Sequence, residues 1–138
     1  MSKISKQVIV MRRDLKNTKG EKVRAGKLMA QAAHASLKAI FDIMGENDEE
    51  NQMCLNYKPK SALRNWIEGR FTKICVSVNS EKELLEVYQK AKDEGLICSL
   101  ITDAGLTEFA GVPTKTCCAI GPEWSDDIDK ITGHLSLL

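Results

Sequence analysis

The 138-residue chain alternates between short apolar runs and longer stretches in which apolar residues recur every three or four positions. The short runs, rich in β-branched residues, predict strands, and the wider spacing predicts helices. We therefore expect four strands, at 7–11, 73–78, 97–101 and 116–120. We expect helices at 24–44, 62–67, 80–94 and 126–132, and an acidic, polar loop at 45–52.

Serine and glycine residues mark where several of these helices begin and end. Ser61, Ser80 and Ser125 each stand at the head of a helical pattern, where a hydroxyl can accept a hydrogen bond from an unpaired backbone N–H. Gly95 and Gly133 follow two of the patterns, as is typical of the residue just beyond a helix end. The three serines are therefore predicted to be N-caps.

The order of strands and helices predicts the fold class. Helices between the first and second strands, and between the second and third, imply crossover connections, which favour parallel neighbours in a sheet covered on both faces. The last two strands are joined without a helical pattern, which fits either antiparallel pairing or separation. We expect an α/β fold, a three-layer α/β/α sandwich with a small four-stranded mixed β-sheet, in one domain over residues 1–138.

Composition narrows the class of protein. Hydrophobic residues make up 43% and charged residues 28%, and no apolar run is long enough to span a bilayer. The first residues lack the apolar core of a secretory signal, so we expect a cytoplasmic protein without a membrane partner.

Cysteine and histidine are placed unfavourably for metal binding. The number of cysteines is odd, and four of the five lie in or near predicted strands, where a free thiol behaves as a small hydrophobic group. Neither His34 nor His134 stands at a metal-ligand spacing from a pair of cysteines. We expect reduced cysteines and no metal.

Positive charge is concentrated at the start of the chain. Residues 1–27 carry nine Lys or Arg against two acidic residues, a balance of +7 in a chain whose net charge is +1. Such a cluster is typical of a surface that meets phosphate groups. Lysines in a glycine-containing loop are equally ordinary as solvated residues, so charge alone leaves both interpretations open.

Four polar residues share one side of the predicted helix at 24–44. At about 100° per residue, Lys27, Gln31, His34 and Lys38 fall within a sector of roughly 60°. Most of their neighbours are apolar or small, so we expect the helix to be buried almost all round. The polar stripe then either faces solvent or lines a cleft, where a cation, an amide and an imidazole can hold a phosphate or an ester.

An acid and several hydroxyl groups are expected on the connection between the last two strands. Asp103 follows one apolar run, and Thr107, Thr114 and Thr116 lead into the next. A loop held by two strands can present such groups to a ligand. Taken singly, Asp103 also fits a turn before Gly105, and threonines are common in strands.

Two motifs together resemble the type II peptidyl-tRNA hydrolases: GKLMAQAAHA at 26–35 and SLITDAGLTE at 99–108, followed by PTKTCCAIGP at 113–122. The resemblance covers almost the whole chain. It implies hydrolysis of the carboxylic ester between a peptide and the 3′ ribose of tRNA, which recycles tRNA from aborted translation. It also implies a homodimer that needs no metal ion, and we expect no cofactor.

The resemblance assigns roles to particular residues. It implies catalytic functions for Lys27, His34, Asp103, Thr107 and Thr116. Gly121 and Pro122 match the turn after the family's fourth strand. From the basic cluster, the helix stripe and the loop, we expect substrate-binding roles for Arg12, Arg13, Lys16, Lys19, Lys22, Arg24, Gln31, Lys38 and Thr114.

These residues suggest a mechanism as a hypothesis. Asp103, with His34 nearby, orients and deprotonates a water that attacks the ester carbonyl, while Lys27 and a threonine hydroxyl stabilise the oxyanion. No Ser or Cys stands in a nucleophile motif, which favours direct attack by water. The sequence leaves open which group is the base. It also leaves two rival functions, a non-catalytic tRNA-binding or protein-interaction module, and an esterase for small substrates that would not need the basic segment.

Overall fold

The structure of the protein, a computed structural model, describes residues 3–138. Its strands are β1 (Ser5–Arg12), β2 (Gly45–Asn47), β3 (Gln52–Cys54), β4 (Lys73–Val78), β5 (Cys98–Asp103) and β6 (Thr114–Trp124). Its helices are α1 (Ala25–Phe41), α2 (Ala62–Glu68), α3 (Glu81–Asp93) and α4 (Ser125–Thr132). Every predicted strand and helix is present; β4 has the predicted bounds, and the others differ at one or both ends by a few residues.

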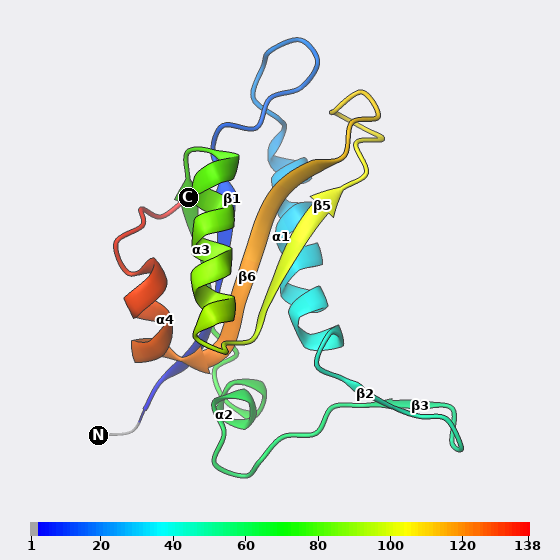
Figure 1. Ribbon diagram of the computed structural model, residues 1–138, viewed down its shortest axis with the longest axis vertical. Helices are drawn as coiled ribbons and strands as arrows, with labels where there is room; N and C mark the ends of the chain where they lie inside the picture. Colours follow the sequence, from blue (N-terminus) through cyan, green and yellow to red (C-terminus); the bar gives the residue numbers. More distant parts are fainter. Residues whose placement is uncertain (1–2) are drawn as a thin grey trace.

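Four strands form one mixed sheet in the order β4, β1, β6, β5 (Figure 1). β1 is a central strand, as its apolar run predicts, and it is parallel to β4 and antiparallel to β6. β5 pairs antiparallel with β6, which decides between the two alternatives for the last strands. Because β6 inserts between β1 and β5, the strands β4 and β5 lie on opposite edges and are not the parallel neighbours that their helical connection favours.

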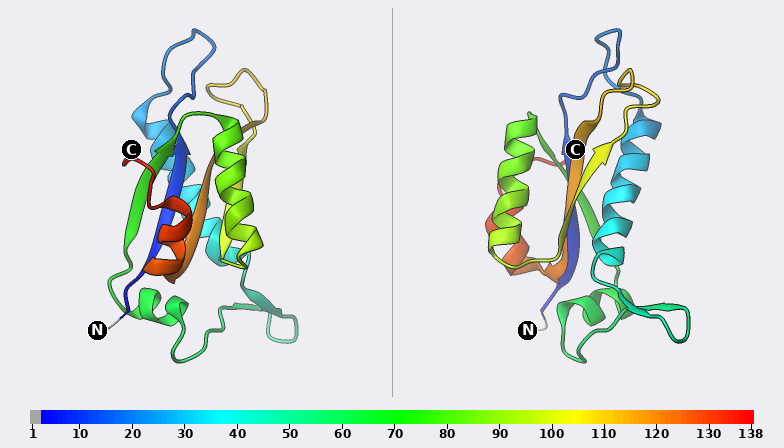
Figure 2. Two further views of the ribbon diagram at one scale, coloured as in Figure 1. Left: turned by 60° about the vertical axis from the view of Figure 1, so that its left-hand side comes forward. Right: turned by 45° about the vertical axis from the view of Figure 1, so that its right-hand side comes forward.

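Helices cover both faces of the sheet, which confirms the α/β class and gives a three-layer α/β/α arrangement (Figure 2). Val8 and Val10 of β1 pack with residues of α3 and α4. Ile9 and Met11, which point the other way, pack with residues of α1. Because both faces are covered, the strands themselves can offer groups to a ligand only at their ends and edges.

Helix α1 is much less buried than its apolar composition predicts. Only Gln31, Ala35 and Ala39 are buried along it, whereas Met29 is 71% and Leu37 53% exposed. The helix rests on the sheet through this one narrow side, which leaves its opposite side to solvent. The prediction of a helix buried almost all round was wrong.

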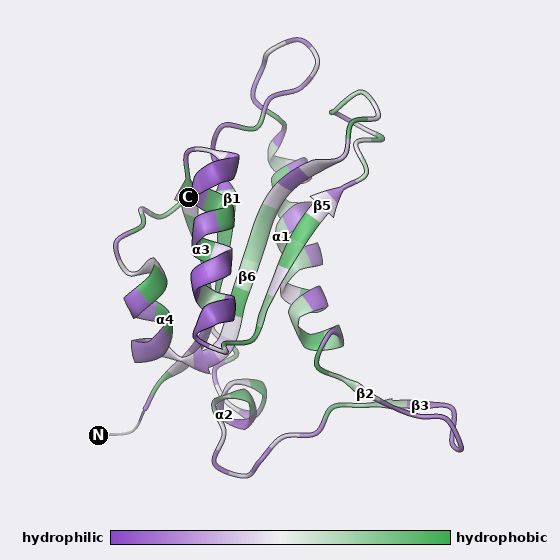
Figure 3. Cartoon of the chain, in the orientation of Figure 1, coloured by the Kyte–Doolittle hydropathy of each residue, from purple (hydrophilic) through white to green (hydrophobic). Residues whose placement is uncertain are grey.

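The acidic segment at 45–52 is a hairpin and not a loop. β2 and β3 pair antiparallel, with Asn51 at the turn in a left-handed conformation, φ 54°. Asparagine tolerates that conformation, so a turn forms where the polar composition suggested irregular chain. The hairpin is largely hydrophilic at its tip and extends away from the sheet (Figure 3).

Two of the three predicted N-caps are confirmed. The Ser61 hydroxyl accepts from the Arg64 N–H, and the Ser80 hydroxyl accepts from the Glu83 N–H. Ser125 is the first residue of α4 instead, since β6 continues to Trp124 and the Ser125 N–H donates to the Ile4 carbonyl at 2.8 Å.

Strand β6 is longer than predicted at its far end. Gly121 and Pro122, expected in a turn, lie within this strand. The Gly121 N–H donates to the Ile97 carbonyl at 2.7 Å, which continues the pairing with the chain beside it.

Two long loops lie side by side at one end of the sheet. The loop 13–24 after β1 and the loop 104–113 between β5 and β6 stand together at the top of Figure 1. Arg24, at the end of the loop 13–24, donates a hydrogen bond to Glu108 in the loop 104–113. The same end of the molecule therefore gathers the basic segment and the expected catalytic loop.

The five cysteines are all free, and Cys117 and Cys118 are buried in the sheet, in agreement with their expected role as core residues. Over residues 3–138, none of the helices has the length and apolar character needed to cross a membrane.

Candidate functional site

A cavity of about 660 Å³ opens between the first half of α1 and the loop 104–113. Its walls bring together four residues of the predicted catalytic set, Lys27, His34, Asp103 and Thr107. The remaining lining residues are Arg24, Gly26, Ala30, Gln31, Ala104, Leu106 and Glu108. The polar stripe of α1 thus lines a cleft over its first turns, which decides between the two alternatives left by the sequence.

The Lys27 ammonium is held between the strand end and the loop. Its Nζ lies 3.1 Å from Oδ2 of Asp103 and donates to Oγ1 of Thr107 at 2.8 Å. The side chains of Lys27 and Asp103 are only 11% and 15% exposed. The ring of Phe109 lies 5.2 Å from the ammonium and adds a cation–π contact. A positive charge is therefore fixed at one position in the wall of the cavity.

The Asp103 carboxylate is surrounded by donors. Oδ2 also accepts from the Gly105 N–H at 2.8 Å, and Oδ1 accepts from Nε2 of Gln31 at 3.1 Å. Burial on its own would raise the pKa of Asp103, but the bonds from Gly105, Lys27 and Gln31 outweigh it and lower that pKa. Asp103 is thus an ionised acceptor whose oxygens are already engaged.

Gly105 makes this arrangement possible. Its φ is +81°, a conformation that other residues rarely adopt, and an added Cβ would collide with the backbone of Val112. The turn after β5 can therefore bring the Gly105 N–H onto Asp103 only with glycine at this position.

Gln31 links the cavity to the interior of the sheet. The hydroxyl of Thr116 donates to Oε1 of Gln31 at 2.6 Å, so the amide nitrogen of Gln31 is left to face Asp103. Gln31 is 1% and Thr116 0% exposed. Thr116, expected among the catalytic residues, is therefore behind the wall of the cavity and contacts Gln31.

His34 stands at the rim of the cavity on the exposed side of α1. Within residues 3–138, its ring forms neither a side-chain hydrogen bond nor an ion pair. The ring nitrogens are available to a water or a ligand in the cavity.

Four of the predicted basic residues are exposed before α1. Lys16, Lys19 and Lys22 are exposed on the loop 13–24, which Asn17 ties together by accepting from the N–H groups of residues 19 and 21. Arg13 is also exposed and donates to the Leu137 carbonyl. These four residues carry exposed positive charge on the segment that leads into α1.

Arg12 is engaged inside the protein. It makes two hydrogen bonds to Asp14 and one to the Lys115 carbonyl, and its side chain is 16% exposed. The bonds from Arg12 lower the pKa of Asp14. The two charges largely neutralise each other, so Arg12 is less suited to a ligand than its sequence position suggests.

Two further residues from the predicted set lie away from the cavity. Lys38 is paired with Asp42 at 2.9 Å, further along α1. The Thr114 hydroxyl donates to the Val112 carbonyl at 2.9 Å, beside a smaller cavity between the two loops.

Glu108 belongs to the site but is absent from the residues predicted from the sequence. It is 8% exposed, and its Oε1 accepts from Nε of Arg24 at 2.8 Å. Its Oε2 is buried and has no hydrogen-bond partner in the part of the chain that the structure describes. Arg24 and Glu108 are far apart in the chain, so no local pattern in the sequence reveals that this buried carboxylate pairs with a basic residue.

The arrangement can stabilise negative charge on a ligand that enters the cavity. A fixed ammonium and a hydroxyl beside it are the donors that a developing oxyanion requires. Among residues 3–138, no group of three or more His, Cys, Asp or Glu side chains is placed to hold a metal ion.

Comparisons with known proteins give one consistent result. The chain is 43% identical to a protein named peptidyl-tRNA hydrolase from Methanocaldococcus jannaschii, over 96% of this chain and 99% of that protein. It is also 43% identical to one of the same name from Methanothermobacter thermautotrophicus, with the same coverage, and 40% identical to one from Methanopyrus kandleri, over 96% and 97%. The family model described as peptidyl-tRNA hydrolase PTH2 matches residues 5–138. The chain therefore belongs to the PTH2 family of peptidyl-tRNA hydrolases.

Proposed function

We propose that this protein is a hydrolase that cleaves the ester bond between a peptide and the 3′ ribose of tRNA. The observation that carries the proposal is the Lys27 ammonium, fixed between Asp103 and Thr107 in the wall of an open cavity, in a chain that belongs to the PTH2 family. The products are a peptide with a free carboxylate and a tRNA with a free 3′ hydroxyl, which returns the tRNA to translation.

Lys27 and Thr107 stabilise the transition state in this proposal. Attack of water on the ester carbonyl places negative charge on the carbonyl oxygen, and the ammonium and the hydroxyl can both donate to it. Asp103 holds the ammonium in place. Thr116 acts through Gln31, which it orients toward Asp103.

We assign the proton transfer to His34. The lowered pKa of Asp103 and the donors already on its oxygens make it a weak base, whereas histidine is the residue type suited to proton transfer near neutral pH. His34 takes a proton from the attacking water, and a proton is returned to the departing 3′ oxygen. In His34→Asn, kcat should then fall by a factor of about 10² or more. A rate close to that of the wild type in this variant would assign the base to Asp103 instead.

The basic surface of Arg13, Lys16, Lys19 and Lys22 binds the tRNA in this proposal. It is exposed on the loop 13–24 and the strand end before it, and this loop leads through Arg24 into the cavity, so it can contact phosphates while the ester reaches Lys27. Such contacts position a nucleic acid without reading its sequence.

The reaction is proposed to run without a metal ion. Lys27 supplies the positive charge that a Lewis acid would otherwise provide to the carbonyl oxygen. Because the substrate arises in translation, we place the reaction in the cytoplasm.

We also propose a homodimer, assembled through the hairpin β2–β3. The hairpin projects from the body of the molecule (Figure 1), and Met53 on it is 57% exposed. Replacement of residues 46–53 by a short glycine-serine linker should convert a dimer to a monomer in analytical ultracentrifugation. A dimer that survives the replacement would place the interface elsewhere.

The proposed activity is tested by release of free tRNA from an N-blocked aminoacyl-tRNA in the presence of EDTA. Turnover should persist with the chelator and fall by a factor of about 10² or more in Asp103→Asn. No turnover by the folded wild-type protein, with tRNA still bound, would favour the non-catalytic binding module. Cleavage of a small ester as fast as that of the N-blocked aminoacyl-tRNA, and unaffected by competing tRNA, would favour the small-substrate esterase.

A further inference from the structure

A second groove runs along α1 beyond the cavity that holds Lys27. It has a volume of about 600 Å³ and lies between the second half of α1 and β5. Apolar side chains line it from Ala33, Leu37 and Phe41 on the helix and from Ile101 on the strand. Leu100 also borders the groove, but its side chain packs on the opposite face of the sheet. Leu37 is 53% and Phe41 51% exposed, so both leave apolar surface uncovered along the groove.

The groove is continuous with the candidate active site. His34 lines both cavities. Thr102 lines the groove, and the next residue of β5, Asp103, lines the site. A ligand held at Lys27 can therefore extend past His34 directly into the groove.

Strand β5 offers an unpaired edge beside this groove. Within residues 3–138, it is the last strand of the sheet and pairs with β6 alone. The Ile97 carbonyl accepts from the Gly121 N–H, and bonding alternates along an antiparallel pair. The backbone groups of Cys98 and Leu100 therefore point away from β6, where an extended peptide can bond to them.

The cavity that holds Lys27 and the groove beyond it differ in charge. Lys16, Lys19 and Lys22 lie on the loop at the end of the sheet that carries Lys27. In the groove, the charges of Lys38 and Asp42 are paired with each other. The basic end suits a polyanion, and the apolar end suits an uncharged chain.

We propose that the groove between α1 and β5 binds the peptide part of the substrate, in an extended conformation along β5. This proposal rests on the proposed hydrolysis of peptidyl-tRNA, whose peptide must leave the site on the side away from the tRNA. The helix from His34 to Phe41 rises by roughly 10 Å. At about 3.3 Å per residue, an extended peptide would place roughly three residues in the groove. The protein then prefers peptides with apolar residues close to the ester.

The test compares two substrates that end in the same residue on the same tRNA. One is N-acetylglycyl-tRNA, and the other carries three leucines between the acetyl group and the glycine. In the double variant Leu37→Ser/Phe41→Ser, KM for the long substrate should rise about tenfold, while KM for the short one should change by less than about twofold. Met29→Ser is the matched control, because Met29 is exposed on the same helix and outside the groove.

The outcomes separate this proposal from the proposed function. Failure of the wild-type protein to cleave either substrate would overturn the hydrolase function itself. Cleavage of both, with equal effects of the double variant on each or none on either, would overturn the peptide groove alone. A dimer that becomes a monomer in the double variant, but not in Met29→Ser, would show that a second copy of the chain covers the groove.

Discussion

The hydroxyl of Thr116 donates a 2.6 Å hydrogen bond to Oε1 of Gln31 and thereby fixes the orientation of the Gln31 amide. With its oxygen occupied, the amide presents its nitrogen to Asp103. Thr116 has no exposed surface. A residue inside the sheet thus controls how the carboxylate beside Lys27 is held.

Thr116→Val should reduce activity without preventing substrate binding. The change keeps the shape of the side chain but leaves the buried Oε1 of Gln31 without its donor, which costs about 1–3 kcal/mol of stability. We expect kcat to fall on the order of tenfold, because Asp103 and Lys27 lose their fixed geometry, with KM unchanged. Thr116→Ser keeps the hydroxyl and should stay near wild type. Equal activity of the Val and Ser variants would remove Thr116 from the mechanism.

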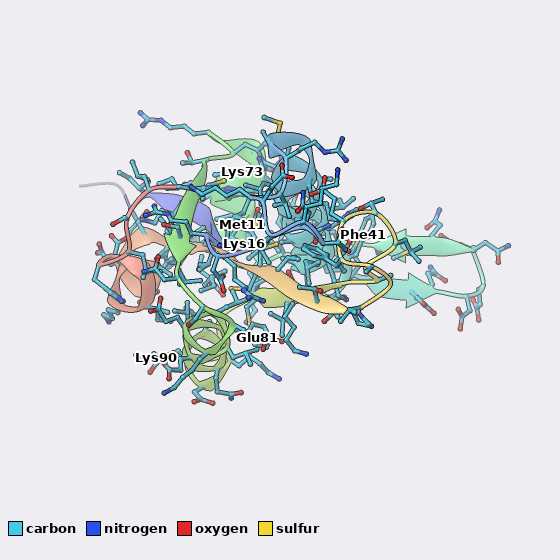
Figure 4. The ribbon with its side chains drawn as sticks, turned by 90° about the horizontal axis from the view of Figure 1, so that it is seen from above. Met11, Lys16, Phe41, Lys73, Glu81 and Lys90 are labelled. Atoms are coloured by element: carbon cyan, nitrogen blue, oxygen red, sulfur yellow. The ribbon has the colours of Figure 1, made fainter. Side chains whose placement is uncertain are left out.

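Lys27→Met should lower kcat by a factor of about 10² to 10³, since it removes a donor to the oxyanion. Single-turnover measurements at saturating enzyme report this step directly. Lys90→Met is the matched control, because Lys90 lies on α3, across the sheet from α1 (Figure 4). A loss in both variants would point to a general effect of charge.

The stability of the protein should depend on the ionisation of Asp103 in acid. Its pKa in the folded protein is below the ordinary value of 3.8, so the folded state binds fewer protons than the unfolded chain in this range. The resulting stabilisation is fully present above pH 3.8 and is lost as the pH falls through the lowered pKa. In urea unfolding from pH 7 to pH 2, the difference between wild type and Asp103→Asn should shrink at the acid end. A difference independent of pH would contradict the lowered pKa.

Removal of Arg24 should leave Glu108 as a buried and unpaired charge. Arg24 provides the hydrogen bond to Oε1, and Oε2 has no partner within residues 3–138. Arg24→Ala should therefore lower the free energy of unfolding by about 1–3 kcal/mol. Adding Glu108→Gln should restore part of the lost free energy of unfolding, because the uncharged amide is less costly to bury. Additive losses in the double variant would show that Arg24 and Glu108 are not coupled.

Binding of tRNA should depend on salt through the loop 13–24. Replacing Lys16, Lys19 and Lys22 by Gln should reduce the slope of log K against log salt concentration by up to roughly 0.7–0.9 for each phosphate that the variant no longer neutralises. The control replaces Lys82, Lys90 and Lys92 on α3, on the opposite face of the sheet from α1; Figure 4 shows Lys16 and Lys90 well apart. Similar slopes for both triple variants would place the tRNA elsewhere.

Much of the fold follows from local patterns in the sequence. The β-branched run at 7–11 has no polar alternation, and β1 is indeed buried on both faces. Ser61 and Ser80 cap their helices because a cap needs only a hydroxyl three residues before an N–H. The hairpin at 45–54 was missed because its turn depends on the left-handed conformation of Asn51, which polar composition does not reveal.

The candidate site was predictable as a set of residues but not as a geometry. Lys27, Gln31 and His34 share a helix face by spacing alone, and the two family motifs pointed to Asp103 and Thr107. Asp14 and Asp42, which pair with Arg12 and Lys38, are only two and four residues away in the chain. The contacts of Lys27 with Thr107 and of Arg24 with Glu108 join residues that are 80 and 84 positions apart. Such long-range contacts depend on which surfaces the packed elements bring together.

The sequence by itself therefore determined the four strands of the main sheet, the four helices, the α/β class, the family and the helix stripe, because each depends on patterns within a short stretch of chain. The tertiary structure decided the insertion of β6 between β1 and β5, which places Thr116 under Gln31 and leaves the edge of β5 unpaired. It also decided that α1 rests on the sheet by one narrow side only, with Leu37 exposed. Strand order and helix orientation depend on packing between distant segments, which no local pattern encodes.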